Sequence, residues 1–563
     1  MTIDKRSVGL TVDGVEVVAD DGAGTLLDLL RHQLGKTDLK DGCSPQGQCG
    51  CCTVLVDGQP RVACVTPVKR VAGRAVTTVG GLEADRRDRW AQSFTATGAS
   101  QCGFCTPGII VRFDALSRSL SPTEVGGGSV GAGHQGQAGV GGRTGPKGRD
   151  PVGQALLAHL CRCTGWQTIS EAWDRFHADP PVSFERSPSQ CEAAERRARL
   201  EGGTAQKVGP EVALGRAGFS ADEAPADAMI ALSDGAGGWV VGDSTGEARA
   251  ALGRIQGRRT TAKHSWPLTV PDGAWAATLR TTWVEPAYLE TDASWCEPGG
   301  EPAPIAANGG AFGAKSTSPV EEAARTLADH HQRPVLALAS REDVTRWGPK
   351  RPPVAGGARP DGTGVLNVIA TPGIAEAVAA VAPGIEVVEF ANPGVGPSTS
   401  AAIRAAGWAE ALVLLAGARG HLASVTAPNG ATASAEIVDN GPSGPVIRAT
   451  VGCGPVLDEV ILRSYCIGAA HMAWSWVTGE ALTVGDDGTI HDLTIRSFGV
   501  TRAVDTPPIE ITIEAGQGEP RNGSDAVFAA VAAATWLAAG WDQDWPVGVP
   551  VIGGSVADAG SGR

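Results

Sequence analysis

The sequence has few basic side chains for its size, and it has no long apolar run. Its 563 residues include 47 Lys and Arg against 61 Asp and Glu, which gives a formal net charge of −14. A phosphate-binding surface needs clustered Lys and Arg, so this balance argues against a nucleic-acid partner. The longest apolar run, 526–541, is shorter than the ~20 residues that a bilayer span requires. We therefore expect no membrane span and interpret this run as a buried helix.

The amino terminus also lacks the apolar segment of a secretory signal, so we expect a cytoplasmic protein. A chain of this length exceeds one hydrophobic core and predicts roughly three or four domains. Of its thirteen cysteines, nine fall between Cys43 and Cys163. In a reducing compartment, clustered thiols more often bind metal than form disulfides. The front of the chain is thus the predicted metal-binding part.

Residues 1–80 have the pattern of a β-grasp, ferredoxin-like domain. Two hairpins are expected, 9–18 and 53–64, each turning at an Asp-Gly pair that accepts the positive φ of a tight turn. Between them, 25–34 has the apolar spacing of an amphipathic helix. This is the order of a β-grasp domain.

A helical domain is predicted at 88–180, from helical spacing at 108–120, 152–160 and 167–176. It is interrupted at 126–149 by a glycine-rich insertion that has too few apolar side chains to pack, and we interpret this insertion as a flexible linker. After it, 185–563 alternates short strands with Ala-rich helices. The fold class is therefore α+β multidomain: a β-grasp domain, a helical domain and a mixed α/β region.

The cysteines divide into two sets of four. The first set is Cys43, Cys49, Cys52 and Cys64, in which three thiols in one glycine-containing loop and one distant thiol match a plant-type [2Fe-2S] site, except for one extra residue before Cys49. Cys51 does not keep the C-x2-C spacing from Cys49, so we expect it not to be a ligand. The second set is Cys102, Cys105, Cys161 and Cys163. Because each pair precedes a helix amino terminus, thiolate charge is stabilised there, but spacing alone leaves a four-cysteine zinc site open for the second set.

QCGFCTPG at 101–108 and CRCTGW at 161–166 resemble the second cluster motif of the xanthine dehydrogenase and aldehyde oxidoreductase family of molybdenum hydroxylases. The first motif is similar too. The resemblance covers 1–180 and implies a β-grasp domain and a four-helix domain, each with a [2Fe-2S] cluster. It also implies that these clusters carry electrons between a molybdenum cofactor and FAD. No flavin domain is visible, so FAD is expected on a partner subunit.

Residues 185–563 resemble the family's molybdopterin-binding domains only in fragments, and this region is much shorter than a complete molybdenum subunit. The stretch 308–315 looks like the family's glycine-rich loop beside the molybdenum centre, and 516–520 looks like its G-x-G-E loop. The resemblance makes Glu519 the candidate catalytic base. The candidate cofactor-binding residues are Gly309, Gly310, Ala311, Phe312 and Gly313.

Three functions follow as hypotheses. In the first, an iron-sulfur oxidoreductase passes electrons from a molybdopterin site in this chain through both clusters to a flavin or other acceptor in trans. In the second, the chain is an electron-transfer subunit only, with molybdopterin in a separate partner subunit. The third is a zinc-stabilised scaffold protein. The substrate cannot be read from the sequence.

Overall fold

The computed structural model describes residues 7–20, 24–120, 150–180, 183–253, 260–305, 310–392, 394, 396–421 and 424–549. The glycine-rich insertion predicted at 126–149 lies outside these residues. No helix in the described ranges combines the length and the apolar character needed to cross a bilayer.

The amino-terminal domain is a β-grasp fold, as predicted. Its sheet has the order β2-β1-β5-β3-β4, and both hairpins turn at Asp-Gly pairs with positive φ at both residues. Cys64 was expected on a strand, but β4 ends at Val62 and Cys64 lies in the 3₁₀ turn η2. The elements are β1 (Ser7–Val12), β2 (Val15–Asp20), α1 (Leu26–Asp28) continued by the π-helical turn η1 (Leu29–Gln33), β3 (Thr53–Val56), β4 (Gln59–Val62), η2 (Ala63–Val65), η3 (Val68–Val71) and β5 (Ala75–Thr77).

In its described residues, the second domain packs four helices around an aromatic core. Trp90 is fully buried and its ring stacks on Phe176 at 3.5 Å between centroids. The helices are α2 (Ala84–Thr97), α3 (Thr106–Ser119), α5 (Pro151–Leu156) and α6 (Gln167–Phe176). The helix expected at 152–160 is shorter than predicted. After it ends, the chain turns so that the Leu160 N–H reaches the Cys49 carbonyl at 3.0 Å.

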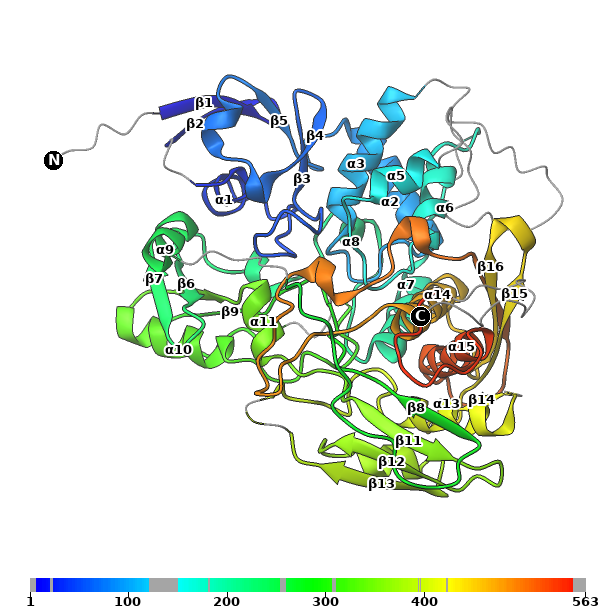
Figure 1. The fold of residues 1–563 in the computed structure, drawn as a ribbon. Helices are drawn as coiled ribbons and strands as arrows, with labels where there is room; N and C mark the ends of the chain where they lie inside the picture. The colour runs from blue at the N-terminus through cyan, green and yellow to red at the C-terminus, as the bar shows by residue number, and fades with distance from the viewer. Residues whose placement is uncertain are drawn as a thin grey trace.

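The region after 185 is built on three four-stranded sheets (Figure 1). Their orders are β7-β6-β10-β9, β13-β12-β11-β8 and β14-β15-β16-β17. The strands are β6 (Met229–Ser233), β7 (Trp239–Gly242), β8 (Ala277–Arg280), β9 (Ala293–Cys296), β10 (Val335–Leu338), β11 (Val354–Ala358), β12 (Gly364–Ile369), β13 (Ile385–Phe390), β14 (Val425–Thr426), β15 (Thr432–Asp439), β16 (Pro445–Gly452) and β17 (Ile509–Glu514).

Helices connect and cover these sheets. The run predicted as a buried helix forms α15, which packs against α14, and these two helices have few exposed residues. The helices are α7 (Pro188–Gly202), α8 (Pro210–Ala213), η4 (Ser220–Asp222), α9 (Thr245–Leu252), α10 (Val320–His331), α11 (Arg341–Trp347), α12 (Ile374–Ala379), α13 (Trp408–Arg419), η5 (Gly441–Ser443), α14 (Glu459–Thr478), η6 (Ile495–Phe498), η7 (Ala503–Asp505) and α15 (Ser524–Ala538).

The hydrophobic cores do not follow the predicted domain boundaries. One core joins the β-grasp and four-helix domains and continues into buried residues of 283–289 and 482–503. A second core lies within the carboxyl-terminal region, around α13, α14 and α15. Because a shared core resists separation, the two amino-terminal domains and this later segment form one packed unit.

Candidate iron-sulfur centres

The first set of cysteines comes together beneath the loop that follows α1. All four of its side chains are at most 2% exposed. Hydrogen bonds from the thiols of Cys49 and Cys64 lower the pKa of Cys43 well below its usual range. The backbone N–H groups of Gln46 and Gln48 also donate to the Cys43 Sγ, at 3.2 and 3.4 Å. These donors favour negative charge on the Cys43 sulfur, whereas the same thiol contacts and burial raise the pKa of Cys49 and of Cys64.

The second set comes together at the start of α3 and before α6. The Sγ atoms of Cys102 and Cys163 are 3.5 Å apart. Hydrogen bonds from Cys105 and Cys163 lower the pKa of Cys161, and the Thr164 hydroxyl lies 3.2 Å from its Sγ. These four side chains are at most 4% exposed. The two pairs, which lie far apart in sequence, thus form one buried group of four thiols.

Both sets suit a binuclear cluster. In the described part of the chain, no group of three or more His, Cys, Asp or Glu side chains is arranged to bind a single metal ion. A [2Fe-2S] cluster makes a different demand, because its four thiolates bind two irons in pairs. Each set supplies four buried, mutually contacting thiols that can meet this demand.

The two sets are joined by short backbone contacts. The carbonyl oxygen of Cys49 accepts a hydrogen bond from Leu160, the residue before Cys161. Gly108 of α3 packs so tightly here that a Cβ on it would lie 2.3 Å from the Gly50 carbonyl oxygen and 3.0 Å from that of Cys51. A single hydrogen bond therefore connects a cysteine of the first set to the neighbour of a cysteine in the second.

Cys51 lies within this junction, 1% exposed, and its thiol contacts that of Cys49. Cys52 instead contacts Cys64. We expect Cys51→Ser to leave the visible absorption and electron paramagnetic resonance of the first cluster intact, whereas Cys52→Ser bleaches or perturbs them. The reverse result would show that the extra loop residue has shifted the ligands by one position.

The glycine-rich loop predicted to bind a pterin lies against the second set. Gly309 falls outside the described residues, but a Cβ on Gly310 would lie 3.0 Å from the Cys163 Sγ. Ala311 and Phe312 line a cavity beside it, and Gly313 packs on the carbonyl of Ala402. The glycine-rich loop thus lies beside the second set, and its role in binding a pterin stays a prediction.

The cavity itself is small, and its mostly apolar lining also includes three arginines and Glu480. Its volume is about 20 Å³, which is room for roughly one water. The Arg162 guanidinium makes two hydrogen bonds to the Glu480 carboxylate, at 2.6 and 2.8 Å. Arg351, which also lines the cavity, pairs with Glu410 at 2.7 Å. Small-molecule sites usually enclose about 300–1,000 Å³, so these residues do not fit a pterin.

Glu519 does not line this cavity. Its side chain is 87% exposed and its nearest ion-pair partner is Arg196, at 3.8 Å. A general base works within hydrogen-bond reach of the group it deprotonates, usually where water is excluded. The position of Glu519 gives no support to its predicted role, which stays a prediction.

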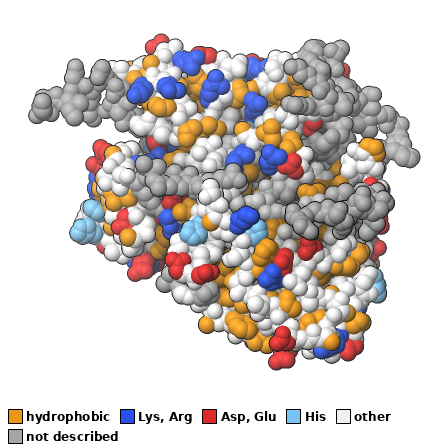
Figure 2. All heavy atoms as spheres, viewed as in Figure 1, with side chains coloured by type: hydrophobic (Ala, Val, Ile, Leu, Met, Phe, Trp, Pro, Cys, Tyr) orange, Lys and Arg blue, Asp and Glu red, His pale blue; other side chains and the backbone are white. Residues whose placement is uncertain are grey.

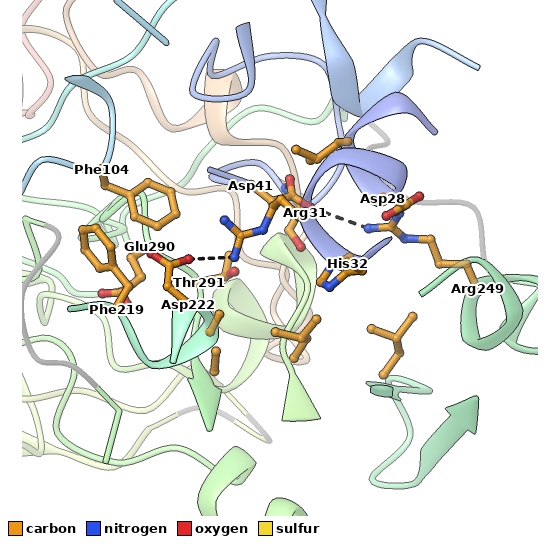
Figure 3. A pocket seen from close by; sticks show the side chains of 16 residues that line it. Asp28, Arg31, His32, Asp41, Phe104, Phe219, Asp222, Arg249, Glu290 and Thr291 are labelled. Carbon is orange, nitrogen blue, oxygen red and sulfur yellow. Dashed lines mark hydrogen bonds and ion pairs between the residues drawn. The ribbon is translucent and has the colours of Figure 1, made fainter. Parts of the chain in front are cut away.

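Sequence reasoning missed a second cavity, between α1 and the β6–β10 sheet (Figure 3). Its volume is about 60 Å³, and charged pairs cross it: Arg31 with Asp222 at 2.8 Å, and Arg249 with Asp28 at 2.6 Å. Burial raises the pKa of Asp41 to about 7. Because these partners are about 190 to 220 residues apart in sequence, no local pattern indicated this cavity. The pairs attach the β-grasp domain to η4 and α9.

Comparison with known proteins places the two cysteine sets in known domains. Residues 10–69 match the 2Fe-2S iron-sulfur cluster binding domain, and 78–174 match the [2Fe-2S] binding domain. The chain is 45% identical over 169 residues to the aldehyde oxidoreductase of Megalodesulfovibrio gigas, but this match covers only 16% of that protein. It is 30% identical over 173 residues to the nicotinate dehydrogenase small FeS subunit of Eubacterium barkeri, covering 94% of it, and 33% identical over 171 residues to the nicotine 6-hydroxylase small subunit of Paenarthrobacter nicotinovorans, covering 88%.

The whole chain also resembles a solved structure. The aldehyde oxidoreductase of Desulfovibrio gigas matches with a TM-score of 0.65 over 97% of this chain and 99% of that one, at 14% identity, which shows a shared fold. The fold and both cysteine sets define an iron-sulfur protein with two [2Fe-2S] domains. The chain belongs to the xanthine dehydrogenase and aldehyde oxidoreductase family of molybdenum hydroxylases, whose members are oxidoreductases.

Proposed function

We propose that this chain is the electron-transfer component of a molybdenum hydroxylase, with the molybdopterin site and FAD on partner subunits. The observation that carries this proposal is the junction between the two cysteine sets, where the Leu160 N–H bonds the Cys49 carbonyl at 3.0 Å. Each [2Fe-2S] cluster, when bound, accepts and returns one electron. The eight thiols hold the clusters, and the junction keeps their ligands in contact.

Two observations favour a separate molybdenum partner over a molybdenum site in this chain. The cavity beside the second set holds about one water, and the arginines in its mostly apolar lining include Arg162 and Arg351, which are paired with carboxylates. In addition, two relatives that match over most of their own length are named as small subunits. The cytoplasm is the expected location, since eight reduced thiols require a reducing compartment.

Metal analysis tests this proposal against the rival in which the chain catalyses hydroxylation itself. We expect the purified chain to hold iron without stoichiometric molybdenum, and dithionite to bleach both clusters reversibly. In the assembled complex, Glu519→Gln is expected to leave turnover within a few-fold of the wild type, because this exposed carboxylate pairs with Arg196 at the surface.

Stoichiometric molybdenum in the isolated chain, together with a ~10²- to 10⁴-fold loss of turnover in Glu519→Gln, would overturn the proposal and restore Glu519 as a general base. The matched control is Glu436→Gln, another exposed carboxylate beside an arginine, which should have no effect under either hypothesis.

A further inference from the structure

Most of the described residues near the eight ligand cysteines are buried or only partly exposed. Among the described residues within two positions of any of them, Val65 is the single exposed one, at 52%. The neighbours of the second set, 100–107 and 159–165, are all buried. Electron transfer between proteins needs close approach, so Val65, next to the ligand Cys64, marks where the first cluster can be approached from outside.

The chain segment around Val65 is basic, although the chain as a whole has a net charge of −14. The segment 59–74 carries four basic residues and no acidic one. Arg61, Lys69 and Arg70 are exposed, and among the described residues none of the three has an ion-pair partner within 4 Å. Figure 2 shows Lys and Arg side chains gathered over the β-grasp domain, with few acidic ones among them.

Packing and hydrogen bonds also hold the first cluster loop in place beside Val65. Val65 packs on Gly47 of the first cluster loop, where a Cβ would lie 3.0 Å from the Val65 Cγ1. Segment 493–496 holds the same loop: Gln46 donates to the Leu493 carbonyl at 2.9 Å, and Arg496 donates to the Gln48 carbonyl at 2.9 Å. Arg496 is exposed and adds a further positive charge beside the loop.

We propose that the surface formed by Arg61, Val65, Lys69, Arg70 and Arg496 is a docking site for an acidic electron-acceptor protein. This inference rests on the proposed function and adds the chemistry of the partner. One electron leaves the reduced first cluster, which is oxidised, and the partner's cofactor gains that electron; no bond forms or breaks. An apolar centre with a basic rim suits an acidic surface, since opposite charges steer encounter and a dry contact brings the cofactors together.

The test uses two protein acceptors of opposite charge, acidic cytochrome b5 and basic cytochrome c. The holoprotein is reduced with dithionite, freed of excess reductant, and mixed with each acceptor in a stopped-flow instrument at low and high ionic strength. We expect the second-order rate for cytochrome b5 to fall about tenfold in Lys69→Glu with Arg70→Glu, and the wild-type rate to fall steeply with salt. The rate for cytochrome c should stay unchanged or rise.

The matched control is Arg196→Glu with Arg199→Glu, an equal charge change at exposed positions of α7. This control should leave the cytochrome b5 rate within about twofold, while Lys69→Gln with Arg70→Gln should give a smaller loss than the reversal. If both charge-reversed double variants lowered the cytochrome b5 rate equally, or if the wild-type rate did not depend on salt, the docking site would be wrong. The proposed function would be unaffected. Failure of dithionite to reduce two clusters would instead overturn the proposed function.

Discussion

Replacing Cys102 and Cys105 together by alanine is expected to halve the iron content, from about four to about two irons per chain. These two thiols are half of the second buried set, and the Cys102 Sγ lies 3.5 Å from that of Cys163. Two remaining thiols cannot complete the coordination of two irons. Iron and sulfide assays, with electron paramagnetic resonance of the dithionite-reduced protein, measure the loss.

The control for this experiment is Cys296→Ala, a buried thiol of the β9 strand outside both sets. It should keep about four irons. A wild-type value near two irons would remove one of the cluster assignments. Zinc in the second set with iron only in the first would revive the four-cysteine zinc site that spacing left open.

The second large effect is expected at Glu480. Its carboxylate is 1% exposed and receives two hydrogen bonds from Arg162, which lies between Cys161 and Cys163 of the second set. Glu480→Gln leaves a buried guanidinium without a compensating charge, and such losses cost about 3–5 kcal/mol. We expect a marked fall in the denaturant midpoint of unfolding, together with weaker retention of the second cluster.

A double variant separates the charge effect from a loss of packing. Arg162→Met with Glu480→Leu removes both charges, and replacing a buried pair by apolar groups is often nearly neutral. This double variant should therefore be more stable than Glu480→Gln alone. A double variant as unstable as the single change would contradict the ion-pair explanation. The exposed pair of Arg325 and Glu301 offers the control, where Glu301→Gln should cost under about 1 kcal/mol.

The amino-terminal fold was predictable because its signals are local. An Asp-Gly pair determines each hairpin turn, and the helices at 108–120 and 167–176 begin just after the cysteines that they position. Three members of the first set were proposed from their spacing within one loop, and the fourth, Cys64, from the hairpin that follows this loop. The exact end of β4 could not be predicted from the sequence. Whether Val62 or Cys64 ends the strand depends on which backbone groups pair with the neighbouring strand, and the residue types do not show this.

The carboxyl-terminal region resisted prediction because its decisive contacts are long-range. Arg162 and Glu480 are 318 residues apart, and Arg351 and Glu410 are 59 apart. No local pattern shows that these pairs fill the space beside the glycine-rich loop. Nor does a G-x-G-E sequence reveal whether Glu519 is covered, since exposure depends on which other segments pack over it.

The contact at Gly108 bears on how fast the two centres can exchange electrons. Even a methyl group there would collide with the Gly50 carbonyl, and both domains share one core. Domains joined by such an interface move less relative to each other than domains joined only by a flexible linker. Packing therefore fixes the distance between the two centres. Electron exchange between them needs no prior movement of the domains. The slow step is then the encounter with the outside partner.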